Sequence, residues 1–223
     1  MRKSFLSIFA LSLLLFFTVS VQAQSKIKVA CVGNSITEGS GLKTTYPQAL
    51  QQLLGEEYEV HNYGVSGRTL LKKGNLPYWK EAKYQEVLAW NPDVVIIKLG
   101  TNDTKPQNWE YKDEFVKDYV ELVKSFKMLP SKPKVYICYP LPVFEDKWGI
   151  TASIVKEEIL PAVKKVARKA KVETIDLYTP FIGKAELTYD GVHPNEAGAG
   201  LLAKEVYQEI TSKGKAAVLN NKK

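Results

Sequence analysis

The chain contains two histidines, His61 and His193, and His193 stands three residues after an acid in a constrained segment. Gly191 permits a tight turn between Asp190 and His193, and Pro194 suits the first turn of a following helix. A carboxylate beside an imidazole fixes its tautomer, and the imidazole can then take a proton from a serine hydroxyl. An isolated Asp-x-x-His is more often a surface turn, so it indicates catalysis only together with a nucleophile. We interpret His61 as a packed strand residue rather than a second base.

Three further residues could supply the nucleophile and its supporting donors. Ser35 lies between an apolar segment and a short helical turn, where its own backbone N–H can point at a developing anion. Asn102 can donate a side-chain N–H, and Gly67 a backbone N–H that no side chain obstructs. Three donors around one oxygen form an oxyanion hole, with each donor worth about 3 kcal/mol in the transition state. Each residue alone is an ordinary turn residue, and it is their conjunction that favours acyl transfer through a serine.

These residues must be positioned by an alternation of strands and helices. Apolar segments predict strands, and amphipathic segments between them predict helices. Short apolar strands alternating with helices are typical of an α/β fold with a parallel sheet covered on both faces. The predicted strands are 27–32, 58–62, 93–99, 135–139 and 172–177, and the predicted helices are 46–54, 84–90, 111–128, 153–170 and 195–210.

The candidate nucleophile, the candidate oxyanion donors and the Asp190–His193 pair all follow predicted strands. In open parallel sheets, ligands bind beyond the carboxyl ends of the strands, so residues just after each strand are expected to meet at one edge. The blocks that follow the strands are Gly-Asn-Ser-Ile-Thr at 33–37, Asn-Tyr-Gly-Val-Ser-Gly at 62–67, Gly-Thr-Asn-Asp at 100–103 and, on a longer loop, Asp-Gly-Val-His-Pro-Asn at 190–195.

The four blocks resemble those of the SGNH, or GDSL, hydrolase family, in the same order and over roughly residues 27–210. The resemblance implies that Ser35 is the nucleophile, His193 the general base and Asp190 the residue that orients the base. It implies that Ser35, Gly67 and Asn102 form the oxyanion hole. It also implies a three-layer α/β/α sandwich with a five-stranded parallel sheet in the flavodoxin-like order 2-1-3-4-5.

Three residues near these blocks are expected to support the site. The family usually has Asp before the serine, whereas this chain has Asn34. Because Asn can make similar backbone hydrogen bonds, we interpret the change as the mark of a branch that includes carbohydrate esterases. Arg68 follows Gly67, and Asp103 follows Asn102. The two charges either pair across the oxyanion loops or are separately solvated.

Two cysteines, Cys31 and Cys138, lie in predicted buried strands. We expect two free thiols that behave as small apolar side chains. In the order 2-1-3-4-5, the third strand separates the strands that carry them. The two residues would then be at least about 9–10 Å apart, which is too far for a disulfide.

The charge distribution excludes an obvious polyanion-binding protein. Residues 1–23 read as a signal peptide, with Arg2 and Lys3 before an apolar segment and small residues before Gln24. This segment and the lysine-rich tail, 213–223, carry most of the net charge of +7. The body between them is nearly neutral, so we expect no nucleic-acid partner. We also expect no stable membrane anchor. We expect no metal and no cofactor, because no cluster of residues with metal-ligand spacing and no phosphate-binding motif is present.

The sequence therefore predicts one hydrolase domain, residues 24–212, in an exported protein that is periplasmic or secreted and a monomer or small homo-oligomer. The predicted activity is serine-dependent hydrolysis of acetyl esters, with O-acetylated carbohydrate as the expected substrate. Two alternatives stay open: a lysophospholipase or thioesterase of the same family, and a non-catalytic carbohydrate-binding protein. The loop aromatics, which either stack on sugar or pack over the sheet edge, are Tyr78, Trp79, Trp109 and Trp148. Lys98, inside an apolar strand, has no assigned role.

Overall fold

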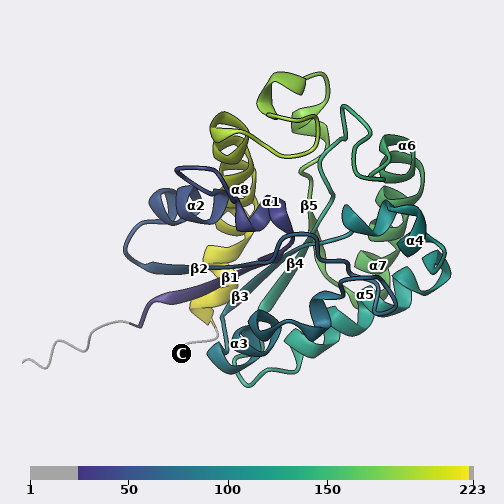
Figure 1. Cartoon of the computed structure of the whole chain (residues 1–223). Coiled ribbons are helices and arrows are strands. Elements are labelled where there is room, and N and C mark those ends of the chain that lie inside the picture. Colours follow the sequence, from purple (N-terminus) through teal and green to yellow (C-terminus); the bar gives the residue numbers. More distant parts are fainter. Residues whose placement is uncertain (1–24, 221–223) are drawn as a thin grey trace, which may run out of the picture.

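A five-stranded parallel sheet forms the centre of the molecule, in the order β2-β1-β3-β4-β5 that the sequence predicts (Figure 1). The computed structural model describes the backbone of residues 25–220 and the side chains of 25–211, so the predicted signal peptide lies outside the described residues. All five predicted strands are confirmed. Their bounds are β1 Ile27–Gly33, β2 Tyr58–Gly64, β3 Val94–Lys98, β4 Lys134–Cys138 and β5 Glu173–Ile175.

Helices cover both faces of the sheet and make the three-layer sandwich. Figure 1 shows α2 and α8 on one side of the strands and α5 and α7 on the other. The helices are α1 Ser35–Glu38, α2 Tyr46–Leu54, α3 Ala82–Trp90, α4 Pro106–Trp109, α5 Lys112–Lys127, α6 Ala152–Ile154, α7 Leu160–Ala170 and α8 Glu196–Asn220. Within the part of the chain that the structure describes, none of them is long and apolar enough to cross a membrane.

The alternation of side chains along each strand produces two separate cores. Val29 and Cys31 of β1 face the core beneath α2 and α8, while Ala30 and Val32 face the core beneath α3, α5 and α7. Because both faces are covered, these strands are apolar throughout rather than alternately polar, as expected for a buried parallel sheet. The polar groups of the chain are therefore left to the loops at the strand ends.

The helix predicted over 153–170 is interrupted in the structure. α6 is followed by a π-helical segment, Val155–Ile159, before α7 begins at Leu160. Pro161 has no N–H to donate, and its ring displaces the carbonyl four residues earlier, so the turn before it widens. The last helix also differs from prediction, since α8 continues from Glu196 to Asn220 and takes in most of the predicted tail.

Both cysteines are buried and free. Cys31 pairs in register with Ile96 of β3, which in turn pairs with Tyr136 of β4, so a whole strand separates Cys31 from Cys138. Burial raises the pKa of each thiol to about 12. The thiols are therefore protonated and shielded at neutral pH.

We expect both thiols to be unreactive in the native protein and fully reactive after unfolding. Iodoacetamide should add no mass at pH 8 without denaturant and should label Cys31 and Cys138 in guanidinium chloride without any reductant. Intact-mass spectrometry measures both. Failure of the unreduced, unfolded protein to take up label would mean that the cysteines are bonded.

Lys98 is a buried charge-bearing residue at the end of β3. Its side chain is 1% exposed, and its amine has no hydrogen-bond partner among the described residues. Burial lowers the pKa of the Lys98 amine to about 7, against a smaller opposing effect of the Cys138 thiol. Between pH 7 and 10.5, the unfolded chain therefore binds more protons at this residue than the folded chain does. The free energy of unfolding should rise with pH across that window.

We expect Lys98→Met to increase the free energy of unfolding at pH 7 and to increase it less at pH 10. The reason is that methionine fills the same space without an amine that the fold must keep neutral. Urea unfolding at both pH values measures the difference, with the exposed Lys80→Met as control. Equal effects of Lys98→Met at the two pH values would contradict this account.

Candidate active site

Ser35 begins a one-turn helix, α1, directly after the end of β1. Asn34 caps this helix: its side-chain oxygen accepts a hydrogen bond of 3.1 Å from the backbone N–H of Ile36. Gly39 ends the helix in a left-handed conformation, φ 71°, and its N–H donates to the Ser35 carbonyl at 2.8 Å. Asn34 is fully buried, so its amide gives the loop the bracing expected of this residue.

The end of β2 supports α1 from below. A Cβ on Gly64 would lie 2.2 Å from the backbone nitrogen of Glu38, so only glycine allows the helix to approach this closely. The Asn62 side chain donates to the carbonyls of Thr37 at 2.9 Å and Glu38 at 3.2 Å. Asn62 and Gly64, at the end of β2, thus position the helix that carries Ser35.

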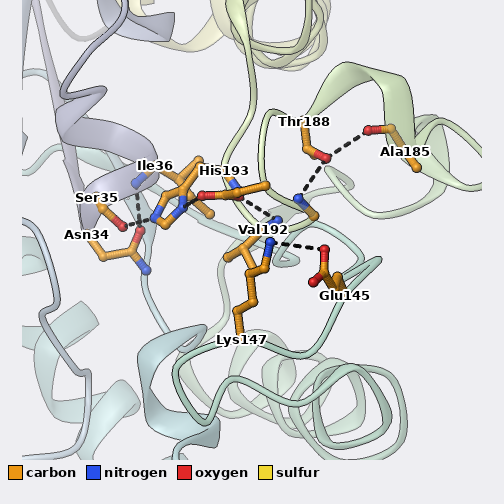
Figure 2. A network of polar contacts seen from close by, with 11 residues as sticks. Asn34, Ser35, Ile36, Glu145, Lys147, Ala185, Thr188, Val192 and His193 are labelled. Carbon is orange, nitrogen blue, oxygen red and sulfur yellow. Dashed lines mark hydrogen bonds and ion pairs between the residues drawn. The ribbon is translucent and has the colours of Figure 1, made fainter.

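A chain of hydrogen bonds links Ser35, His193 and Asp190 (part of it visible in Figure 2). The Ser35 hydroxyl lies 2.8 Å from Nε2 of His193, and Nδ1 of His193 lies 2.8 Å from Oδ2 of Asp190. With Nδ1 protonated and donating to the carboxylate, Nε2 is left as the acceptor for the serine proton. The structure therefore brings together the three residues that the sequence assigns to proton transfer and nucleophilic attack.

The loop that carries Asp190 and His193 is held by its own backbone. Oδ1 of Asp190 accepts the amides of Val192 at 2.9 Å and His193 at 2.7 Å. Burial raises the pKa of Asp190, but these two amides and the imidazole outweigh it, so the pKa is lowered overall. Thr188 accepts from the Gly191 amide and donates to the Ala185 carbonyl, as Figure 2 shows. The carboxylate stays ionised and fixed in position.

The proposed oxyanion donors come from three different loops. Gly67 has φ 78°, which its lack of a side chain permits. The side-chain amide of Asn102 donates one hydrogen to the Arg68 carbonyl at 3.2 Å, which leaves its second hydrogen free to face a substrate. Among the described residues, the backbone amides of Ser35 and Gly67 have no hydrogen-bond acceptor. These groups are available as donors to an anion.

The hypothesis of an Arg68–Asp103 ion pair is wrong. Arg68 instead pairs with Glu81, Nε to Oε1 at 2.7 Å. Asp103 is fully buried, and its carboxylate accepts the backbone amides of Leu70 at 3.0 Å and Leu71 at 2.8 Å. Burial raises the pKa of Asp103 to about 6, with the amides opposing the rise. Asp103 still links the loop that carries Asn102 to the loop that carries Gly67, but it does so through backbone amides and not through Arg68. The Leu70 and Leu71 amides need an acceptor, and the Asp103 carboxylate provides it.

The aromatic loop residues divide into packed and exposed ones. Tyr78 is buried and its hydroxyl donates to the Tyr63 carbonyl, while the Trp79 indole donates to the Leu70 carbonyl. Trp109 is also buried, so packing is the outcome for these three. Trp148 differs, because it is 59% exposed and its ring centroid lies 5.5 Å from that of His193.

One residue beside the site was missed by sequence reasoning. Tyr189 is 58% exposed and stacks on His193 at 5.7 Å between ring centroids, with 11° between the planes. Its position directly before Asp190 was the only available signal. His61 lies elsewhere, stacked on Trp90 at 4.1 Å and 2.9 Å from Glu59, as expected for a packed strand residue.

The arrangement can transfer an acyl group through Ser35. It contains a hydroxyl nucleophile, a base within hydrogen-bond distance, a carboxylate that orients the base, and unpaired donors on adjacent loops. Among the described residues, no group of three His, Cys, Asp or Glu side chains is placed to hold a metal ion.

We expect Asp103→Asn to lower kcat by about 10-fold or more with little change in KM. The reason is that a shift of the loops that carry Gly67 and Asn102 would weaken their proposed hydrogen bonds to the oxyanion, which forms only in the transition state. Asparagine has nearly the same volume as aspartate, but its side-chain N–H donors would face the N–H of Leu70 or Leu71, which needs an acceptor. Steady-state kinetics on a soluble acetyl ester measures the effect. The matched control is Asp113→Asn, which changes an exposed carboxylate in α5. An unchanged kcat would remove Asp103 from the support of the site.

The chain is similar in sequence to bacterial esterases. An acetylxylan esterase of Xylanibacter ruminicola is 38% identical over 215 residues, which cover 86% of this chain and 45% of that protein. The chain thus spans about half the length of this relative. An acetylxylan esterase of Geobacillus stearothermophilus is 28% identical over 82% of this chain and 93% of that protein.

The fold is shared with solved esterase structures. The crystal structure of the acetyl xylan esterase AlAXEase superposes with a TM-score of 0.67 and 24% identity, covering 82% of this chain and all of that one. The model of the GDSL-like lipase/acylhydrolase family matches residues 31–201, which include Ser35, Gly67, Asn102, Asp190 and His193. The chain therefore belongs to the GDSL-like lipase/acylhydrolase family.

Proposed function

We propose that this protein is an exported serine esterase that removes O-acetyl groups from carbohydrate. The observation that carries the proposal is the continuous hydrogen-bond chain from the Ser35 hydroxyl through His193 to Asp190. This chain gives serine a base and gives the base a fixed tautomer, which are the two requirements for nucleophilic attack on an ester.

In the first half of the reaction, His193 takes the proton of Ser35 as Oγ attacks the acetyl carbonyl. The oxyanion that forms receives hydrogen bonds from the backbone N–H groups of Ser35 and Gly67 and from the Asn102 side chain. Asp190 stabilises the imidazolium without taking its proton. His193 then protonates the oxygen of the departing alcohol, and an acetyl-serine remains.

In the second half, water replaces the alcohol. His193 removes a proton from the water as it attacks the acetyl-serine carbonyl, and the same donors hold the second oxyanion. Collapse of this intermediate returns the proton to Oγ of Ser35 and releases acetate.

Two observations favour an acetyl ester over a long-chain ester. The hollow lined by Ser35, Tyr189 and His193 is small, with space for about one water molecule, so no long apolar channel leads away from Ser35 on this side. Two similar bacterial proteins are named acetylxylan esterases, which points to an acetylated polysaccharide. Export is proposed from the signal-peptide pattern of residues 1–23.

The proposal predicts release of acetate from acetylated xylan and other acetylated glycans, with a loss of about 1,000-fold or more in kcat for Ser35→Ala. Serine-reactive fluorophosphonate should label the wild type and not the variant. Acetate release across a panel of acetylated sugars, together with 4-nitrophenyl esters of increasing chain length, provides the measurement.

Two outcomes would count against the proposal. A preference for acyl chains of eight carbons or more would favour a lysophospholipase or thioesterase. Absence of both acetate release and fluorophosphonate labelling would favour a non-catalytic carbohydrate-binding protein.

A further inference from the structure

Two exposed aromatic rings flank the imidazole of His193. The large apolar side chains that are exposed among the described residues are Leu53, Leu76, Met128, Trp148, Ile182 and Tyr189. The two aromatic residues of this set are also the two whose rings contact His193, at 5.5 and 5.7 Å between centroids. Exposed aromatic surface is therefore concentrated beside the proposed base.

Trp148 has a left-handed backbone conformation, which is unfavourable for a residue with a large side chain. It has φ 53° and the next residue, Gly149, has φ 78°, while Ile150 donates back to the Lys147 carbonyl at 2.7 Å. Two successive central residues with positive φ make a turn of the type I′ kind, in which Asn, Asp and Gly are the preferred residues. An indole at the first position is strained, and its 59% exposure gives little burial in return.

The loop that carries Trp148 is fixed to both halves of the site. The amide of Phe144 donates to the Gly191 carbonyl at 2.8 Å, which docks the loop on the Asp190–His193 segment. The amide of Thr151 donates to the Thr104 hydroxyl at 3.3 Å, which ties the other end to the segment after Asn102. The backbone of the turn that carries the indole is thus fixed relative to the reacting groups.

Chemistry assigns this position to the alcohol part of the substrate. In the acylation step, the departing oxygen lies against the imidazole that protonates it. An acetyl ester has only a methyl group on its acyl side, so the alcohol is the one extended part of the substrate that a ring next to His193 can contact. One face of a pyranose ring presents C–H groups, which complement the negative face of an aromatic ring.

We propose that Trp148 is the residue that binds the sugar ring bearing the acetyl group, and that it determines selectivity for a carbohydrate over a simple alcohol. This inference rests on the proposed acetylesterase function and adds to it the part of the site that recognises the leaving group. The strained turn presents the indole to that ring.

Substrates with one acyl group and two kinds of alcohol test the inference. For Trp148→Asn, we expect kcat/KM on an acetylated xylo-oligosaccharide to fall by about 10-fold or more, and kcat/KM on ethyl acetate to change by less than about 3-fold. Trp148→Phe should recover part of the loss on the oligosaccharide. The melting temperature of Trp148→Asn should be unchanged or higher, because asparagine suits the turn.

The matched control is Lys171→Asn, which relieves the same backbone strain at an exposed residue, φ 52°, between α7 and β5. It should leave both activities unchanged. An equal loss on both substrates for Trp148→Asn would make Trp148 a support for His193 only, and no loss on either would make it a bystander. Both results overturn the inference, whereas a wild type that hydrolyses ethyl acetate and no acetylated sugar refutes the proposed function itself.

Discussion

A single hydrogen bond of 2.8 Å, between the Ser35 hydroxyl and His193, joins residues 158 positions apart in the chain. The rest of the fold is arranged so that these two atoms meet. Ser35 follows β1, which lies between β2 and β3, and His193 lies in the loop before α8, near the other end of the sequence. Because α2 and α8 share one core with the β1 side chains, a change in the packing of that layer alters the separation of the two groups.

Hydrogen bonds from backbone amides to side-chain oxygens hold the loops around this bond in place. Asp190 accepts two amides of its own loop, and Asp103 accepts two amides from the loop that carries Gly67. Asn34 accepts one backbone amide, that of Ile36, at the start of α1. Carboxylate and amide oxygens in such positions satisfy donors that would otherwise be buried without partners. These acceptors order the four loops of the site together with side-chain ion pairs such as Arg68–Glu81.

The sequence predicted the strands and the residues at the strand ends, because apolar segments ended by polar blocks leave few alternatives, and the family resemblance implied the order of the strands. It did not predict which groups the charged side chains contact. Arg68 and Asp103 suggested an ion pair by charge, yet burial and two unsatisfied amides determine where Asp103 binds. Nor could it separate Trp148 from Tyr78, Trp79 and Trp109, since exposure depends on how distant loops pack. The π-helical segment before Pro161 had a local signal, the proline itself, and was missed because the apolar pattern continued through it.

The separation of Cys31 and Cys138 by β3 has a consequence for how the protein can be made. Its stability owes nothing to an oxidant, so the domain needs no disulfide isomerase and no oxidising environment to reach its native state. The redox state of the surroundings therefore leaves the covalent structure of the described domain unchanged.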